Sequence, residues 1–432
     1  MFAAAICAVV LLSLIIFGVH IFLALGVAGA IGLVMTGGLN ALALATTSFF
    51  GQLNSFEMIA LPLFILMGHV LAKTPIGRDL FHVASRWLNW LPGGLAIASV
   101  GACTVFGAVS GVSIAGVAAI GGLAVPEMVG HGYSRRLAAG SVVTAGALAM
   151  LIPPSVPFII YSAVTGESIA KLFIGGIIPG LVLAAMLSAY IFVRVLLNPE
   201  EAPSASERRY TWRERLASLG QIWHALLLIL AVLGSIYSGF ATPTEASAVG
   251  AAGAFLIAGF VYRILSVSSF WRILKESMRI SAAILIIMAS AKIFGDFLNM
   301  VRVPQELSRF LLSFNLPGMV VILIIMILLV FLGMFVDAVS LIVVTTPILL
   351  PLIVGLGYDP LYYGIILVMN LEMAVVTPPV GLNLYTLKGV CSFLEIEEII
   401  RSSIPFVVVQ FVALLLFTLF PSLSLWLPGF VR

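Results

Sequence analysis

The sequence has little charge for its length. Asp, Glu, Lys and Arg make up 9% of its 432 residues, hydrophobic residues make up 62%, and the mean hydropathy is +1.21. Soluble domains carry roughly 25% charged residues. The composition therefore excludes a soluble globule and indicates an all-α polytopic membrane protein in a lipid bilayer. The net charge of +3 is too small, and the Lys and Arg residues too scattered, for a nucleic-acid partner.

Motifs of metal centres and hydrolases are also lacking. Cys7, Cys103 and Cys391 sit in apolar stretches without metal-ligand spacing, which is typical of small buried side chains. The five histidines show no i, i+4 pairing and no HExxH motif. The stretch from Gly111 to Ala115 lacks the second glycine of a GxSxG elbow. An enzyme is therefore not expected.

Apolar segments fall into two successive sets. Predicted crossings lie at about 2–18, 20–37, 55–72, 134–163 and 172–197, and then at about 221–238, 244–262, 279–298, 360–386 and 403–428. Residues 93–127 and 317–351 are too long for one span and too short for two of about 20 residues, which predicts two re-entrant helical hairpins. The polar residues 198–220 predict a cytoplasmic linker between a first repeat, 1–197, and a second, 221–432.

Two proline pairs, Pro153-Pro154 and Pro378-Pro379, lie in the middle of apolar crossings. Proline removes a backbone donor and breaks a helix, so the segments about 134–163 and 360–386 are predicted to be broken helices. Non-helical backbone at membrane depth is tolerated where it is buried in protein or lines a water-filled cavity. Helix breaks at matching positions of two halves are typical of a transporter. The two proline pairs lie 225 residues apart in the sequence. The same offset relates other matching residues of the two halves: Leu91-Pro92-Gly93 and Leu316-Pro317-Gly318, Pro126 and Pro351, and Gly132-Tyr133 and Gly357-Tyr358.

Five crossings in each half make the second repeat inverted relative to the first. Placing the linker in the cytoplasm puts most of the 21 Lys and Arg residues on that side, as the positive-inside rule requires. Both termini are then expected to face the periplasm. Amphipathic stretches at 78–90 and 305–314 precede the hairpins and predict helices lying in the membrane interface.

The hairpin tips carry the candidate ion ligands. Ser110 and Ser113 of the first tip offer hydroxyl oxygens that suit a hard cation such as Na⁺; alternatively they pack helices or bond to a backbone carbonyl. Asp337 of the second tip is a carboxylate in an apolar setting, which costs about 2.5 to 3.5 kcal/mol at mid-membrane and favours a cavity or an ion. An N-cap role for Asp337 remains open and is compatible with ion binding.

The broken helices offer backbone groups with negative and with positive partial charge. Carbonyl groups before each break suit a cation, and the helix N-termini after the breaks, near Val156 and Gly381, suit an anion. Ser155, Thr377 and Asn383 are the nearest polar side chains. Roles for Asn370 and Glu372 stay open between lining the route and bonding to a neighbouring helix. Lys292 and Asp296, at i and i+4, are expected to form a structural pair.

Several long motifs resemble one family. They are SGVSIAGVAAIGGLAVPEMVGHGYS, AMLIPPSVPFIIYS, TPTEASAVGA, GMFVDAVSLIVVTTPILLPL and NLEMAVVTPPVGLNLY. Together, from about Ala24 to Pro405, the chain is similar to the large membrane subunit (M, or DctM-like) of tripartite ATP-independent periplasmic (TRAP) transporters. The resemblance implies Na⁺-driven symport of a small organic anion, for example a C4-dicarboxylate or a sialic-acid-like carboxylate, across the bacterial inner membrane by an elevator mechanism. It also implies a periplasmic substrate-binding protein and a separate small four-helix membrane subunit.

The resemblance places the sites as well. It puts one Na⁺ between Ser110, Ser113 and the backbone at Pro153-Pro154, and a second between Asp337, Ser340 and Thr377-Pro378. Substrate is then expected between the tips, with Ser113, Ser155, Asp337 and Asn383 as contacts. Family members often show Gly-Ser-Ser at the first tip; Gly111-Val112-Ser113 lacks one hydroxyl, which shifts the expected ligation toward backbone carbonyls. The alternatives are a two-hairpin Na⁺/dicarboxylate carrier that needs no binding protein, and a non-transporting scaffold or channel.

Overall fold

The protein is helical throughout its described part. A computed structural model describes residues 2–203, 210–314 and 316–430, and within them every regular element is a helix. The all-α fold class is thereby confirmed. Residues 204–209 of the predicted linker, and the terminal residues 1, 431 and 432, lie outside the described residues.

Within the described ranges, ten α-helices precede the predicted linker, one lies in it and ten follow it. The first ten are α1 (Phe2–Ile16), α2 (Ile21–Gly37), α3 (Leu42–Leu53), α4 (Ala60–Ala72), α5 (Ile76–Leu88), α6 (Gly94–Ser110), α7 (Ser113–Gly130), α8 (Arg135–Ala147), α9 (Val156–Thr165) and α10 (Ile169–Leu197). The others are α11 (Trp212–Leu219), α12 (Trp223–Tyr237), α13 (Pro243–Leu256), α14 (Val267–Met300), α15 (Val303–Leu312), α16 (Gly318–Gly333), α17 (Ala338–Gly355), α18 (Pro360–Ala374), α19 (Leu382–Val390), α20 (Ile396–Leu419) and α21 (Pro421–Leu425).

Six of these helices are long and apolar enough to cross a membrane. Two further pairs of helices are bent at a short break, and if each pair forms one span, the number of spans rises to eight. The chain is a multi-pass membrane protein. Helices α6 and α7 occupy the first predicted hairpin, and α16 and α17 the second. Re-entry into the bilayer, the repeat boundaries and the periplasmic termini stay predictions.

Each predicted broken helix consists of two helices separated by its proline pair. Helix α8 ends at Ala147 and α9 begins at Val156; α18 ends at Ala374 and α19 begins at Leu382. Both Pro-Pro bonds are cis. The first break is buried, whereas the second is partly exposed. The amphipathic stretches form α5 and α15 immediately before the two helix pairs.

Several elements differ from the sequence prediction. The last predicted crossing, 403–428, is divided between α20 and α21, and α20 already begins at Ile396. No crossing was predicted over 42–53, where threonines and Gln52 stand among the apolar residues, yet α3 forms there. Thr46 and Thr47 donate to the carbonyl groups four residues back, so their hydroxyls are satisfied within the helix. Helix α14 begins at Val267 rather than near residue 279, because Ser266 and Ser269 cap its N-terminus reciprocally.

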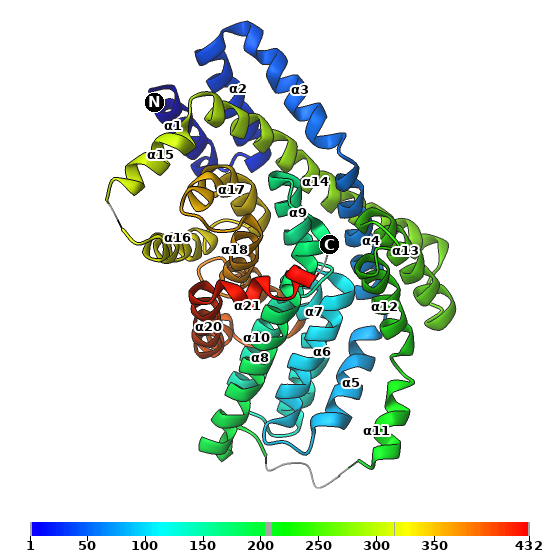
Figure 1. The fold of residues 1–432 in the computed structure, drawn as a ribbon. Coiled ribbons are helices and arrows are strands. Elements are labelled where there is room, and N and C mark those ends of the chain that lie inside the picture. The colour runs from blue at the N-terminus through cyan, green and yellow to red at the C-terminus, as the bar shows by residue number, and fades with distance from the viewer. Residues whose placement is uncertain (1, 204–209, 315, 431–432) are drawn as a thin grey trace.

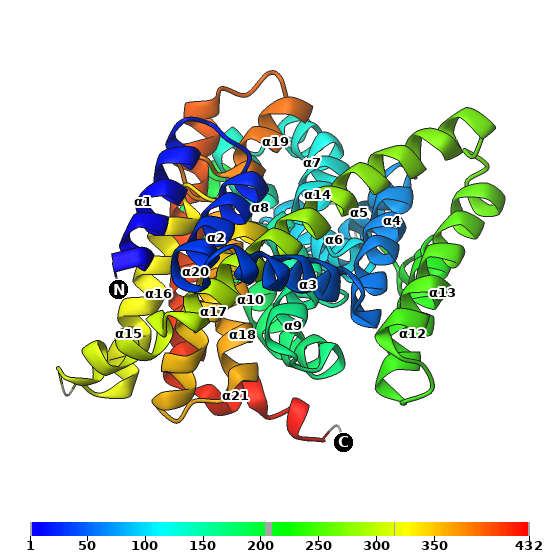
Figure 2. The same cartoon turned by 90° about the horizontal axis from the view of Figure 1, so that it is seen from above.

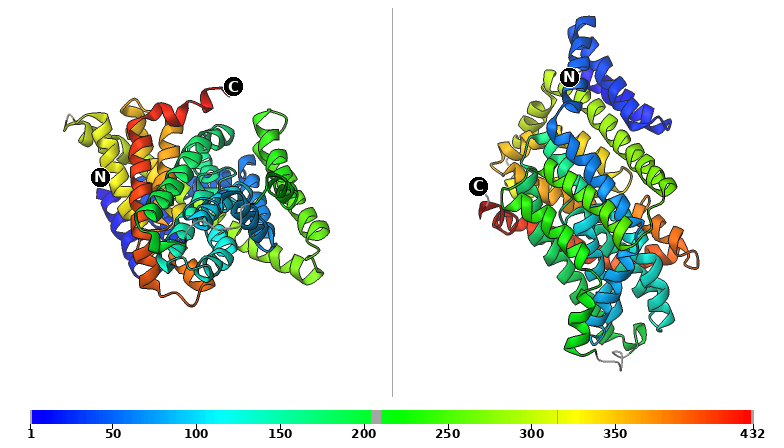
Figure 3. Two further views of the ribbon diagram at one scale, coloured as in Figure 1. Left: turned by 90° about the horizontal axis from the view of Figure 1, so that it is seen from below. Right: turned by 90° about the vertical axis from the view of Figure 1, so that its right-hand side faces the viewer.

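Helix α14 runs diagonally across the molecule and packs against α2, α3 and α4 (Figure 1). Small residues permit this approach: a Cβ on Gly29 would collide with the backbone of Phe294. Helices α12 and α13 lie at one side of the molecule, and α16 and α20 at the other (Figure 2). Helices α1 to α3 gather at the end opposite to the C-terminal end of α10 (Figure 3, right). Helix α8 is buried from Leu137 to Ala147, and Ser110 and Gly111 of the first tip are buried as well.

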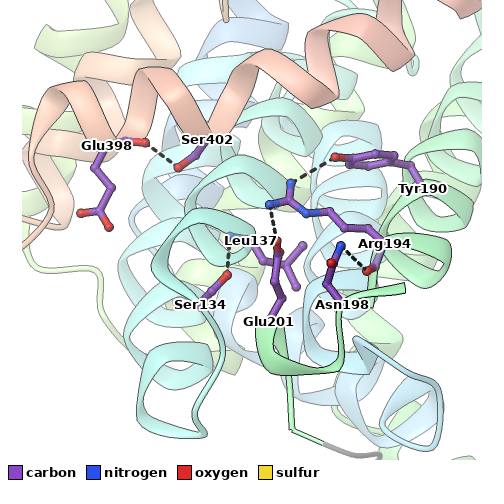
Figure 4. Close-up of polar contacts among 8 residues, drawn as sticks. All are labelled: Ser134, Leu137, Tyr190, Arg194, Asn198, Glu201, Glu398 and Ser402. Atoms are coloured by element: carbon purple, nitrogen blue, oxygen red, sulfur yellow. Dashed lines mark hydrogen bonds and ion pairs between the residues drawn. The ribbon is translucent and has the colours of Figure 1, made fainter. Parts of the chain in front are cut away.

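The chain leaving α10 is tied back to the helices around it (Figure 4). Arg194 donates to the Glu201 carboxylate over 2.8 Å and to the Tyr190 hydroxyl over 3.1 Å. The backbone N–H of Ser134 donates to the Glu201 carbonyl, and the Ser134 hydroxyl caps α8. Farther along the predicted linker, α11 packs on α5, since the Trp87 indole N–H donates to the Arg215 carbonyl over 3.2 Å.

Candidate functional site

The first tip is a two-residue connection between α6 and α7. Gly111 adopts the left-handed conformation with φ of 65°, which glycine takes without steric cost. A Cβ on Gly111 would collide with the Pro154 carbonyl oxygen, and the N–H of Val156 points to the Gly111 carbonyl over 3.5 Å. The first tip and the first proline pair are thus in direct contact, as the Na⁺ assignment requires.

Ser110 and Ser113 have different surroundings at this tip. Ser110 is 1% exposed, and its hydroxyl oxygen has no hydrogen-bond partner among the described residues. Ser113 donates to the Asn383 side-chain carbonyl over 3.2 Å. A buried hydroxyl without a partner costs free energy. Ser110 directly precedes Gly111, which contacts the first break, and its hydroxyl oxygen is the kind of ligand that a hard cation takes.

The second tip meets the second proline pair in the same way. The N–H of Val380 donates to the Met334 carbonyl over 3.2 Å, which joins the tip to the break. Asp337 caps α17: its carboxylate accepts from the Ser340 N–H over 3.1 Å and from the Ser340 hydroxyl. The capping alternative is therefore realised. Asp337 is also exposed, so its carboxylate keeps the capacity to bind an ion.

Thr377 and Pro378 lie in the second break, before α19. The Thr377 hydroxyl donates to the Met373 carbonyl over 2.7 Å, which leaves the lone pairs of the hydroxyl oxygen free to accept. Gly381 is the N-cap residue of α19 and adopts the left-handed conformation with φ of 43°. Among the described residues, no group of three or more His, Cys, Asp or Glu side chains is arranged to hold a metal ion.

Both tips line one cavity of about 220 Å³. Its wall includes Val112 and Ser113 from the first tip and Asp337 and Ala338 from the second, together with apolar residues of α4 and α14. The first residues of α9 and α19, Val156 and Leu382, also line it. Four helices, α7, α9, α17 and α19, therefore begin at this cavity.

Ser155 and Asn383 do not belong to the described wall of this cavity. Ser155 is fully buried; its hydroxyl caps α9 and donates to the Met150 carbonyl across the break. Asn383 is fully buried as well and donates to the Val143 carbonyl of α8 over 3.2 Å while it accepts from Ser113. In this conformation both side chains bond to protein groups around the site and stabilise its structure. Their contact with substrate stays a prediction.

Sequence reasoning missed the contributions of α4 and the bonds between the halves. Ile65 and His69 of α4 line the cavity, and Gly68 packs against the Ser110 carbonyl. The only signal for α4 was this glycine inside an apolar helix, which marks a close approach of another backbone. The second half of each broken helix packs on the other half of the chain: α19 lies on α7 and α8, and Tyr161 of α9 donates to the Pro360 carbonyl at the start of α18 over 2.7 Å.

Long apolar helices and two broken helices around a shared cavity define a multi-pass membrane protein built like a secondary transporter. Residues 8–423 match the family described as tripartite ATP-independent periplasmic transporter, DctM component. The chain belongs to this family. It is a transporter component and not an enzyme.

Relatives extend the match over almost the whole chain. The C4-dicarboxylate TRAP transporter large permease protein DctM of Vibrio cholerae is 33% identical over 448 residues, covering 99% of this chain and 97% of that protein. The isethionate TRAP transporter permease protein DctMQ of Oleidesulfovibrio alaskensis is 36% identical over 415 residues, covering 96% of this chain. This chain spans 65% of the length of that second relative.

The fold is similar to that of a transporter whose crystal structure has been solved. The crystal structure of the Alcanivorax borkumensis YdaH transporter superimposes with a TM-score of 0.63, covering 91% of this chain and 90% of that one at 14% sequence identity. At this identity the likeness supports the architecture alone.

Proposed function

We propose that this chain is the membrane carrier of a three-component system that imports a small organic anion together with Na⁺ across the bacterial inner membrane. A periplasmic substrate-binding protein delivers the anion, and a small membrane subunit accompanies the chain. The convergence of four helix N-termini on one 220 Å³ cavity carries this proposal. A helix N-terminus carries about half a positive charge, which favours an anion such as a carboxylate, and no side chain of the described residues caps the N-terminus of α7.

Sodium coupling rests on the oxygen donors beside this cavity. The first ion lies by the unpartnered Ser110 hydroxyl, Ser113 and the Pro153-Pro154 backbone, and the second by Asp337, Ser340 and the Thr377-Pro378 carbonyl groups. Each net positive charge that enters gains about 2.3 kcal/mol per 100 mV of inside-negative potential. Binding Na⁺ beside an organic anion also lowers the cost of moving either charge through the membrane. Elevator movement of the tips with their broken helices completes the cycle.

The experiment is uptake of labelled organic anions into proteoliposomes holding the membrane components, with the binding protein added outside. Uptake is expected only with an inward Na⁺ gradient and with the binding protein present. Uptake by the membrane part alone would favour the carrier that needs no binding protein. Passive conductance without Na⁺-dependent uptake would favour a channel and contradict the proposal.

Asp337→Asn separates the ion role of Asp337 from its capping role. Asn caps helices about as well as Asp, so the unfolding temperature is expected to stay near the wild-type value. Loss of the carboxylate charge is expected to abolish Na⁺-dependent uptake. Asp337→Ala removes the cap as well and is expected to cost about 1 kcal/mol more. Wild-type Na⁺ dependence in Asp337→Asn would contradict the second ion site.

A further inference from the structure

The interior of the second half holds a carboxyl group that the sodium sites do not use. Glu372 lies near the end of α18 and is 0% exposed, and neither of its carboxyl oxygens has a hydrogen-bond partner among the described residues. Gln410 of α20 is 3% exposed, and neither its amide oxygen nor its amide nitrogen is hydrogen-bonded within the described chain. The Gln410 amide is the polar neighbour of the Glu372 carboxyl, although the two fall short of hydrogen-bonding geometry.

No cation among the described residues pairs with Glu372. It takes part in none of the described ion pairs. Helices α16, α17 and α21, which pack against α18, carry no Asp, Glu, Lys or Arg among their described residues. The ionisable groups on the other packed helices and on α18 itself are Lys171, Tyr190 and Arg194 of α10, Arg135 and Arg136 of α8, Tyr161 of α9, Glu397, Glu398 and Arg401 of α20, and Tyr362 and Tyr363 of α18.

Those charged groups lie toward helix ends or have their own partners. Arg194 pairs with Glu201, and Arg401 lies nine residues before Gln410 along α20, which is about 13 Å of helix. An ionised carboxylate without a partner in such an interior is strongly disfavoured, and the group takes up a proton instead. The neutral acid supplies one O–H donor and one carbonyl acceptor, which match the acceptor and the donors of the Gln410 amide.

The fold does not require polar groups at these positions. At the 225-residue offset, the first half has Ala145 and Ala147 where the second half has Asn370 and Glu372, and both alanines are fully buried. Asn370 donates to the Met326 carbonyl over 2.7 Å, so it is explained by a bond to a neighbouring helix. Glu372 has no such explanation. A buried ionisable group without a structural role points to function.

We propose that Glu372, with Gln410, forms a proton-binding site in the membrane interior, separate from the sodium sites, and that Glu372 carries one proton inward in each transport cycle. The inference rests on the proposed transport function. The balance is simple: the carboxylate takes a proton from the periplasmic water when the site opens outward, and the acid returns it to the cytoplasmic water. Because α18 leads into the second break, Glu372 travels with that break.

The test follows protons and substrate in the same proteoliposomes. With all three components and a Na⁺ gradient, wild-type uptake is expected to acidify the lumen, as read by a trapped pH dye, with the membrane potential clamped. Glu372→Gln mimics the neutral acid and is expected to keep Na⁺-dependent uptake and to lose the coupled acidification. Glu397→Gln, which removes a carboxylate from the exposed start of α20, is the matched control and is expected to keep both.

Infrared difference spectra of the purified protein give a second readout. We expect the wild type to show the band of a protonated carboxyl group at neutral pH. We expect this band to be absent from the Glu372→Gln variant. If wild-type vesicles show Na⁺-dependent uptake without acidification, the proton site is wrong while the proposed function stands. That wild-type result decides the matter even if the variant fails to fold. Absence of Na⁺-dependent uptake would instead overturn the proposed function.

Discussion

Gly111 shows what the first tip demands of a single residue. Its left-handed backbone and its contact with the Pro154 carbonyl leave no room for a Cβ atom. Gly111→Ala is expected to cost roughly 1 to 2 kcal/mol for the left-handed conformation alone. It also separates the tip from the proline pair. We expect a lower unfolding temperature in detergent and weaker protection of the protein by Na⁺ against heat.

Gly130→Ala is the matched control, because a Cβ there meets no atom within 4 Å and the residue lies at the end of helix α7. Its unfolding temperature is expected to equal or exceed that of the wild type. A Gly111→Ala protein as stable as Gly130→Ala, with unchanged protection by Na⁺, would show that the tip does not need this contact.

Side-chain roles at the site were predictable only where local chemistry decides them. The N-cap role of Asp337 and the pair between Lys292 and Asp296, at 2.9 Å, follow from sequence spacing. The role of Asn383 does not, because its partners Ser113 and Val143 lie more than 200 residues away in the chain. Spacing rules hold within one helix, whereas contacts between halves depend on how the helices pack.

Helix α19 belongs to the second half of the chain but packs on α7 and α8 of the first half, where the Ser113 hydroxyl donates a hydrogen bond to Asn383. A neutral hydrogen bond of this kind contributes about 1 kcal/mol. A double-mutant cycle with Ser113→Ala and Asn383→Ala is therefore expected to show a coupling energy of about 0.5 to 1.5 kcal/mol in unfolding measurements.

Thr386 provides the control for this cycle. Its hydroxyl lies on the same helix, is exposed, and within the described part of the chain bonds only to the Leu382 carbonyl. Ser113→Ala and Thr386→Ala are expected to be additive. Equal coupling energies in the two cycles would mean that the bond between the halves contributes nothing specific.

The broken helices were the most predictable elements, and α3 the least. Tandem prolines in an apolar segment exclude a continuous helix, so the new helices begin at Val156 and just after Gly381, as expected. Helix α3 mixes threonine and glutamine with apolar residues, and it packs against α14. Propensity alone does not decide such a segment.

At the scale of the whole molecule, a seam that is partly polar runs between α14 and two other helices, α9 and α17. A cavity of about 360 Å³ lies between α14, α9 and α17, and Lys292 and Asp296 line it. Ser48 of α3 donates to Asp296 over 2.6 Å, which ties the pair to the α14 side. Polar, hollow contacts hold two bodies together less tightly than an apolar core does. The seam is therefore the surface along which elevator movement is expected.

A disulfide across this seam tests the movement. A Cβ built on Gly295 of α14 lies 3.7 Å from the Pro347 Cβ of α17, within the range of about 3.5 to 4.5 Å that disulfides need. In a background with Cys7, Cys103 and Cys391 replaced by alanine, oxidised Gly295→Cys/Pro347→Cys protein is expected to lose uptake, and reduction is expected to restore it. Gly26→Cys/Ser290→Cys joins α2 to α14 on one side of the seam, with 3.6 Å between the Cβ atoms, and oxidation there is expected to leave uptake unchanged. Full uptake by completely cross-linked Gly295→Cys/Pro347→Cys protein would mean that α17 does not slide past α14, because a bond of about 2 Å between the two sulfur atoms permits no such displacement.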